Sequence, residues 1–164
     1  MSELFEKLPP QTEQLNNHIG QQTRLLRDFT RRLELILSQD HKKIPIRDIT
    51  FSADFTAFCT QLRQHMDQTM AHWQQLREQI RKALAGKQYP STLEAKSFAL
   101  RAKTLSGTCD EFTTAYDVFV NLYKNYTLSK LPVWVLTSCS DDLNNWTKKI
   151  LFLSREITKY AVTK

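Results

Sequence analysis

The side chains best suited to chemistry in this sequence are its histidines and cysteines. His65 and His72 lie seven residues apart, a rise of about 10 Å along a helix, which is too far for both imidazoles to bind one metal ion directly. Cys59, Cys109 and Cys139 are widely spaced and form no C-x-x-C or Cys/His cluster of the kind that binds zinc. We therefore expect neither a metal site nor a cofactor.

Catalytic motifs are also missing from the sequence. Nucleophilic catalysis needs a serine or cysteine beside a base, and the sequence has no G-x-S-x-G elbow, Gly-rich phosphate loop or H-x-E signature. Asp141 and Asp142 are adjacent carboxylates, but we expect them in the first turn of a helix, where the helix dipole favours acids. The sequence thus predicts a protein that is not an enzyme.

Positive charge is concentrated in one part of the chain. The formal net charge is +6, and residues 24–47 contain seven basic residues against three acidic ones. A basic patch attracts phosphate groups or an acidic protein surface; the alternative is a solvated helix face with partial charge pairing. The candidate partner-binding residues of this stretch are Arg24, Arg27, Arg31, Lys42, Lys43 and Arg47.

Nucleic-acid binding is one use of this basic stretch. Its first three arginines should share an outward strip of a helix, where they could follow a phosphate backbone. No aromatic residues alternate with these charges to stack on bases.

Apolar residues outside the core pattern indicate a protein partner instead. Trp134, Leu151 and Phe152 are candidate partner-binding residues of this kind, because exposed apolar patches usually mark a partner or a dimer contact. The alternative is a wide contact within the core.

The elements that would carry these residues are four helices. Four segments repeat apolar residues at alternate steps of three and four, which is the pattern of an amphipathic helix. The helices are expected at residues 12–39, 52–85, 91–126 and 132–162. Such helices pack as an antiparallel bundle. We therefore predict an all-α, antiparallel four-helix bundle that forms a single domain over residues 11–164, with residues 1–10 as a loose N-terminal tail.

The predicted core stripes run along one face of each segment. The first two contain Leu15, Ile19, Leu26, Phe29, Leu33 and Ile36, then Phe55, Cys59, Leu62, Met66, Trp73, Leu76, Ile80 and Ala83. The other two contain Phe98, Ala102, Leu105, Cys109, Phe112, Tyr116, Phe119, Tyr123 and Tyr126, then Leu136, Cys139, Leu143, Trp146, Ile150, Leu153, Ile157 and Tyr160. Only Gln22 interrupts the first stripe, and Thr69 is the polar member of the second.

Local residue types suggest where the helices begin and end. Ser91 and Glu94 have the spacing of a capping box at the start of the third helix. Gly86 suits a left-handed residue just past the second helix. Pro45 cannot continue the first helix. The connection that follows, with Ile44, Ile46, Ile49 and Phe51, should fold over one end of the bundle.

The expected cellular compartment follows from the absence of a membrane-spanning segment and of a secretory signal in the sequence. No segment approaches the roughly 20 apolar residues that span a bilayer, and the N-terminus has no secretory pattern. The cysteines lie on core stripes, as small buried hydrophobic residues that suit a reducing setting. We expect a cytoplasmic protein without a membrane span; its oligomeric state stays open.

Three short matches connect the sequence with a bacterial family. They are Phe58-Cys59 followed by Leu62, Leu105 followed by Tyr116-Asp117, and Val135-Leu136 leading to Leu143. In these the chain resembles the regulator of sigma D (Rsd/AlgQ) family of small four-helix bundles, over roughly residues 52–70 and 100–155. The resemblance implies an anti-sigma regulator of transcription, which binds the primary sigma factor and restrains its use by RNA polymerase.

Two further readings of the sequence remain. Phe51-Ser52-Ala53-Asp54-Phe55 and Tyr89-Pro90 resemble the N-terminal half of the primosomal PriC family, which implies binding to single-strand-binding protein and DNA. Small helical bundles are also common among the components, chaperones and effectors of bacterial secretion systems. Across all three readings, we expect a non-enzymatic regulatory or adaptor bundle that acts by binding a macromolecular partner.

Overall fold

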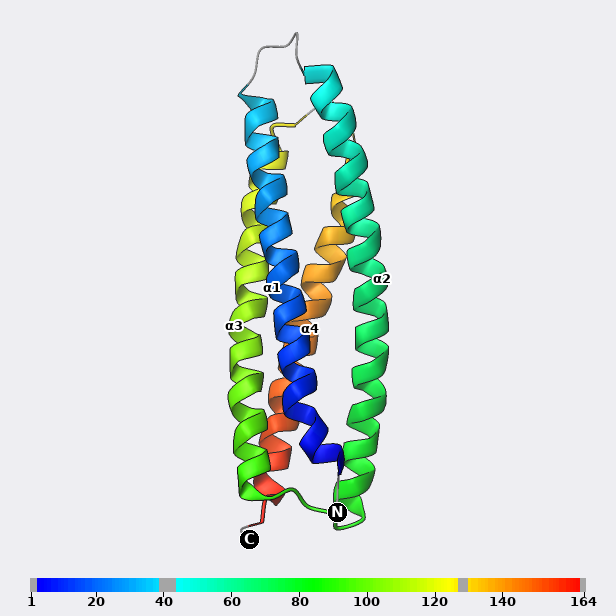
Figure 1. Cartoon of the computed structure of the whole chain (residues 1–164), viewed down its shortest axis with the longest axis vertical. Helices are drawn as coiled ribbons and strands as arrows, with labels where there is room; N and C mark the ends of the chain where they lie inside the picture. Colours follow the sequence, from blue (N-terminus) through cyan, green and yellow to red (C-terminus); the bar gives the residue numbers. More distant parts are fainter. Residues whose placement is uncertain (1–2, 39–43, 127–129, 163–164) are drawn as a thin grey trace.

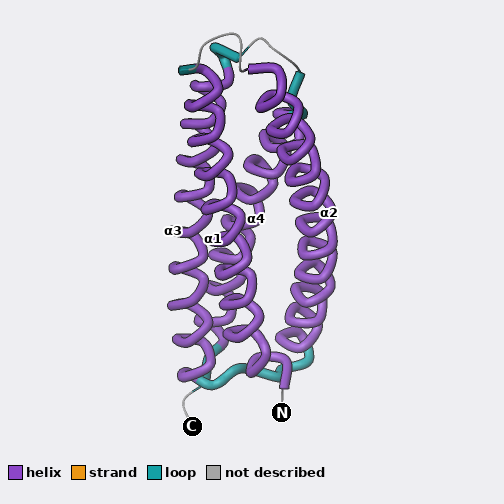
Figure 2. Tube along the Cα trace, turned by 45° about the horizontal axis from the view of Figure 1, so that its top comes forward, coloured by secondary structure: helices purple, strands orange, loops and turns teal. Residues whose placement is uncertain are grey.

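The structure, a computed structural model, describes residues 3–38, 44–126 and 130–162, apart from the side chains of Glu3 and residues 44–48. It consists of four long helices, α1 (Glu3–Leu37), α2 (Ile44–Ala85), α3 (Thr92–Tyr123) and α4 (Val133–Tyr160). The helices lie lengthwise around a common core (Figure 1, Figure 2). The predicted all-α four-helix bundle is confirmed. No helix in the described part of the chain combines the length and the hydropathy needed to cross a membrane.

The order of the helices around the bundle differs from their order along the chain. Successive helices run in opposite directions, and α1 and α4 each pack against both α2 and α3 (Figure 1). The neighbouring pairs α1/α3 and α2/α4 are therefore parallel. The link from α2 to α3 crosses one end of the bundle, where an isolated β-bridge pairs Ser91 with Val162 beyond the end of α4.

The core is built from the predicted stripes. Every apolar stripe residue on α1 and α2 is buried, from Leu15 to Ile36 and from Phe55 to Ala83. The differences are confined to tyrosines: Tyr116 and Tyr123 of α3 are half-buried and Tyr160 of α4 is exposed. A phenol needs a partner for its hydroxyl, so it favours the edge of a core over its centre.

At the point where Gln22 interrupts the first stripe, the neighbouring Thr23 occupies the buried position instead. Thr23 is 2% exposed, and its hydroxyl donates to the carbonyl of Ile19 at 2.9 Å. Thr12 and Thr30 are buried on the same face and bond in the same way to the carbonyls four residues before them. Because these hydroxyls are satisfied within their own helix, they leave no unpaired polar group in the core.

The N-terminal segment corrects one prediction. We expect a loose tail over residues 1–10, but the described part of this segment is the start of α1. Phe5 and Leu8 are each 1% exposed. The helix continues through Pro9 and Pro10 and bends near its N-terminal end, because prolines remove backbone hydrogen bonds (Figure 1). Burial of the two large apolar side chains, about 1.5–3 kcal/mol each, offsets that loss.

The first connection is also shorter than predicted, because α2 begins at Ile44. Pro45 stands in its first turn, where proline is tolerated. Phe51 is fully buried, as expected of a residue that folds over the end of the bundle, whereas Ile49 is 69% exposed, contrary to that expectation. The side chains of Ile44 and Ile46 lie outside the described residues. The other predicted helix ends agree with the structure within three residues.

The start of α3 carries the predicted capping box. The Ser91 hydroxyl accepts from the amide of Glu94 at 3.1 Å, and the Glu94 carboxylate accepts from the amide of Ser91 at 2.8 Å. Two backbone donors that the first turn would leave free are thereby satisfied. The short link before α3 thus ends at a defined residue.

The end of α2 differs from the prediction in which residue is left-handed. No described glycine has a positive φ, and Lys87 has a φ of 63° in place of Gly86. The amide of Gln88 donates to the carbonyl of Ala83 at 2.9 Å and the amide of Lys87 to that of Leu84 at 3.1 Å. These two hydrogen bonds form a Schellman motif, whose left-handed residue is Lys87, one residue after the predicted Gly86.

Replacing Lys87 by glycine should therefore stabilise the protein. A side chain at positive φ is strained, so we expect Lys87→Gly to raise the free energy of unfolding by up to about 1 kcal/mol, measured by urea denaturation. Gln88→Gly is the matched control and should give no gain. A loss of stability in Lys87→Gly would contradict the assigned cap.

Candidate partner-binding groove

The arginine strip of α1 lies on an open helix face. Arg24, Arg27 and Arg31 are all exposed, as the pattern predicts. Arg31 forms an ion pair with Asp28 at 3.2 Å in which both side chains are largely exposed. Exposed pairs of this kind contribute less than about 1 kcal/mol. The strip is a solvated face whose charge is partly neutralised along the same helix.

The remainder of the predicted basic patch is not assembled within the described residues. Lys42, Lys43 and the side chain of Arg47 lie outside them. Arg32, which is close to the strip in sequence, binds Asp54 of α2 at 2.9 Å. It links α1 to α2 and does not extend the open strip.

The three apolar candidates of α4 occupy different surroundings. Trp134 is 72% exposed and Phe152 is 50% exposed, whereas Leu151 is half-buried and packs against the core. From the rise of a helix, Trp134 and Phe152 stand about 27 Å apart. They therefore do not form one patch, and each belongs to a separate part of the surface.

Phe152 lies in a groove of about 540 Å³ between the C-terminal ends of the parallel helices α2 and α4. We call this the α2/α4 groove. Its lining residues are Arg81, Leu84, Ala85, Phe152, Arg155, Glu156, Lys159 and Tyr160. Within this lining Leu84 is buried and Glu156 half-buried, whereas Phe152, Tyr160 and the three cations are exposed.

Cations dominate the charge of the α2/α4 groove. Arg81, Arg155 and Lys159 are exposed and, within the described part of the chain, form no ion pair; Glu156 is the one acid in the lining. Both helices end here, so part of this charge offsets the negative ends of two helix dipoles. The unpaired cations still provide a field that attracts anionic groups.

On α4 the cations alternate with an aromatic ring. Lys148, Phe152, Arg155 and Lys159 follow at steps of four, three and four, and all are exposed. This spacing places them on one face of the helix. In the sequence such alternation was considered only at residues 24–47, and this strip on α4 was not predicted. Its spacing of three and four residues is the same signal that predicted the core stripes.

Tyr160, which lines the groove, stacks on Tyr89. The rings of Tyr160 and Tyr89 have centroids 5.5 Å apart and an interplanar angle of 14°. Tyr89 belongs to the link between α2 and α3. Val162 holds that link against α4, because it donates to the carbonyl of Pro90 and accepts from the amide of Thr92. Tyr160 is thus held in place while 44% of it remains exposed.

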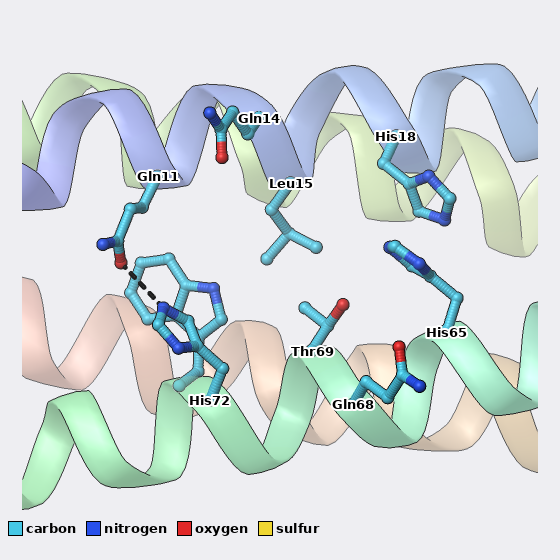
Figure 3. A pocket seen from close by; sticks show the side chains of 9 residues that line it. Gln11, Gln14, Leu15, His18, His65, Gln68, Thr69 and His72 are labelled. Atoms are coloured by element: carbon cyan, nitrogen blue, oxygen red, sulfur yellow. Dashed lines mark hydrogen bonds between the residues drawn. The ribbon is translucent and has the colours of Figure 1, made fainter.

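A second groove, of about 330 Å³, lies between α1 and α2 and is lined without charged carboxylates or amines (Figure 3). We call it the α1/α2 groove. Its lining residues are Gln11, Gln14, Leu15, His18, His65, Gln68, Thr69, His72 and Trp73. A neighbouring hollow shares His18, His65 and Gln68 and adds Gln22, Leu25, Phe58, Gln61 and Gln64.

His18 and His65 are in ring contact across the α1/α2 groove, with centroids 3.6 Å apart. The Nε2 atom of His18 is buried and has no hydrogen-bond partner in the described structure. Burial, together with the neighbouring His65, lowers the pKa of His18. Further along, His72 Nε2 lies 3.2 Å from Gln11 Oε1. Within the described residues, no group of three or more His, Cys, Asp or Glu could hold a metal ion.

The adjacent acids of α4 have a structural place that the sequence did not predict. Asp141 and Asp142 lie more than two turns into α4, not in its first turn. Asp142 binds Arg63 of α2 at 2.7 Å, and Arg63 also binds Asp67 at 2.6 Å and the hydroxyl of Ser138 at 2.9 Å. The cluster links α2 to α4 and leaves no pair of free carboxylates for acid–base work.

The cysteines are buried, as their position on core stripes predicts. Burial raises the pKa of Cys59 to about 12 and that of Cys109 and Cys139 to about 11. A thiol with so high a pKa is protonated at neutral pH and is a poor nucleophile.

No family model matches the chain, and the comparisons with curated proteins and with solved structures gave no match either.

Proposed function

We propose that the chain is a non-enzymatic cytoplasmic binding protein that takes a single-stranded nucleic acid into the α2/α4 groove. The observation that carries this proposal is the meeting of three unpaired cations, Arg81, Arg155 and Lys159, with two exposed aromatic rings in one groove. Proteins that bind single strands combine a basic groove for the backbone with rings on which bases stack.

In this proposal each group has a role. The cations of α2 and α4 line the groove and are exposed, so they can contact phosphates. Phe152 is 50% exposed and Tyr160 is 44% exposed, so part of each ring is available to bases. Lys148 extends the strip one turn beyond Phe152.

Two triple variants test this proposal, because each removes three positive charges from a different surface. Arg81→Gln/Arg155→Gln/Lys159→Gln alters the groove, and Arg24→Gln/Arg27→Gln/Arg31→Gln is the matched control on α1. We expect the groove variant to lose at least about tenfold in affinity for a labelled oligothymidylate. The slope of log K against log salt should fall by about 2, as expected for three lost phosphate contacts. Fluorescence anisotropy across a salt series measures both quantities.

Two results would contradict the proposal. One is no salt-dependent binding by the unaltered protein, and the other is an equal loss in both triple variants. Phe152→Ala separates stacking from charge: it should weaken binding by about 1–3 kcal/mol, the range for a base on an aromatic ring, without changing the salt slope.

A protein partner is the second candidate, and the exposed Trp134 favours it. Trp134 is 72% exposed at the start of α4, far from the α2/α4 groove, and tryptophan is enriched among residues that dominate interfaces. Together with the resemblance to the Rsd/AlgQ family, this supports a regulator that binds the primary sigma factor and restrains its use by RNA polymerase. Purified sigma factor that fails to bind the protein, or binds Trp134→Ala equally well, would count against this candidate.

A further inference from the structure

We propose that His18 and His65 form a proton-sensitive contact, which holds α1 against α2 while the imidazoles are neutral and weakens as they take up protons. This contact is separate from the α2/α4 groove and does not depend on the proposed function. The two rings come from different helices and face each other across the α1/α2 groove (Figure 3).

Among the described residues, the side chains that line the two hollows around the pair include no carboxylate that could balance a proton. The side chains that line the groove around it are glutamines, a threonine, His72 and apolar residues. Two acids of these helices, Asp67 and Glu13, have basic partners of their own. Asp67 binds Arg63, which also binds Asp142 of α4, and Glu13 of α1 lies 3.9 Å from Arg101 of α3.

Protonation changes this contact in two ways. A proton on Nε2 of His18 would be a donor at a buried atom that has no acceptor within the described residues, which is unfavourable. A second proton, on His65, would place two like charges on rings whose centroids are 3.6 Å apart. The neutral pair has neither cost and keeps the tilted ring contact, with an interplanar angle of 35°.

The direction of the pH dependence follows from the pKa of His18. Burial, and then His65, lowers this pKa below its ordinary value of 6.5 in the folded protein. The unfolded chain therefore binds a proton at a pH where the folded chain does not. The stability due to the neutral ring is complete above the ordinary pKa and is lost as the pH falls through it toward the lowered value.

Urea unfolding at pH 7.5 and pH 5.5 tests the inference. In the unaltered protein we expect the unfolding equilibrium constant to rise severalfold between the two pH values. His18→Gln should remove most of that rise, whereas His72→Gln, an exposed imidazole of the same groove, should keep it. An undiminished rise in His18→Gln would overturn the inference.

A second measurement covers the case in which His18→Gln does not fold. An NMR titration of the unaltered protein should show the His18 imidazole taking up its proton below its ordinary pKa of 6.5. Hydrogen exchange at pH 5.5, corrected for intrinsic rates, should accelerate in α1 and α2 beside the pair before it does in α3. Titration of His18 at its ordinary pKa, or uniform exchange, would overturn the inference.

Discussion

Replacing Phe112 by alanine should lower the free energy of unfolding by about 3–5 kcal/mol, the range for large aromatic side chains removed from a core. Phe112 is fully buried on α3. α3 packs closely on both α1 and α4, so two neighbours hold the cavity open and limit its collapse. Urea denaturation at neutral pH, followed by circular dichroism, measures the loss.

Val118→Ala on the same helix is the matched control for Phe112→Ala. Val118 is 51% exposed, and surface substitutions usually change stability by no more than about 0.5 kcal/mol. A similarly small change in Phe112→Ala would mean that the stripe on α3 does not face the core. Trp146→Ala, on the facing stripe of α4, should repeat the large loss.

Replacing Phe5 by alanine should also cost about 3 kcal/mol, the lower end of the same range. Phe5 is 1% exposed in the first turns of α1, and sites near a helix end collapse more readily than sites at the centre. Lys7→Ala, two residues later on the exposed face, is the control and should be nearly neutral. The same urea titration measures both variants.

The Phe5→Ala variant distinguishes the two descriptions of the N-terminal segment. A loose tail would tolerate the substitution without loss, as the sequence pattern predicts. A helix whose first turns belong to the core would not. A change in the free energy of unfolding below about 0.5 kcal/mol would therefore support the predicted loose tail and contradict the packing of Phe5 and Leu8.

The helical repeat of apolar residues predicted most of the fold, because the need to bury one face of each helix determines that repeat directly. Along the stripe from Phe55 to Ala83 on α2, every residue but Thr69 is apolar, because the inner face of a bundle favours apolar side chains whichever helix lies opposite. The same pattern does not say which helix lies opposite. The parallel pairs α1/α3 and α2/α4 depend on the path of the link around Tyr89, which no stripe encodes.

The errors have local causes. Pro9 and Pro10 indicate a helix start, yet burial of Phe5 outweighs their preference and extends α1. Gly86 indicates the left-handed position, but hydrogen bonding at the end of α2 assigns that position to Lys87.

The two grooves depend on pairs of helices, which a single stripe cannot predict. Phe152 and Arg155 share a face of α4 that the sequence reveals, but Arg81 joins them only because α2 and α4 are neighbours.

The three buried thiols give the bundle an internal reporter of its motions. Cys59, Cys109 and Cys139 lie on α2, α3 and α4, one on each of these three helices. An alkylating reagent reaches a buried thiol only when that part of the protein opens. Alkylation rates of the three cysteines, followed by mass spectrometry, would therefore rank how often each helix separates from its neighbours, without any added label or engineered residue.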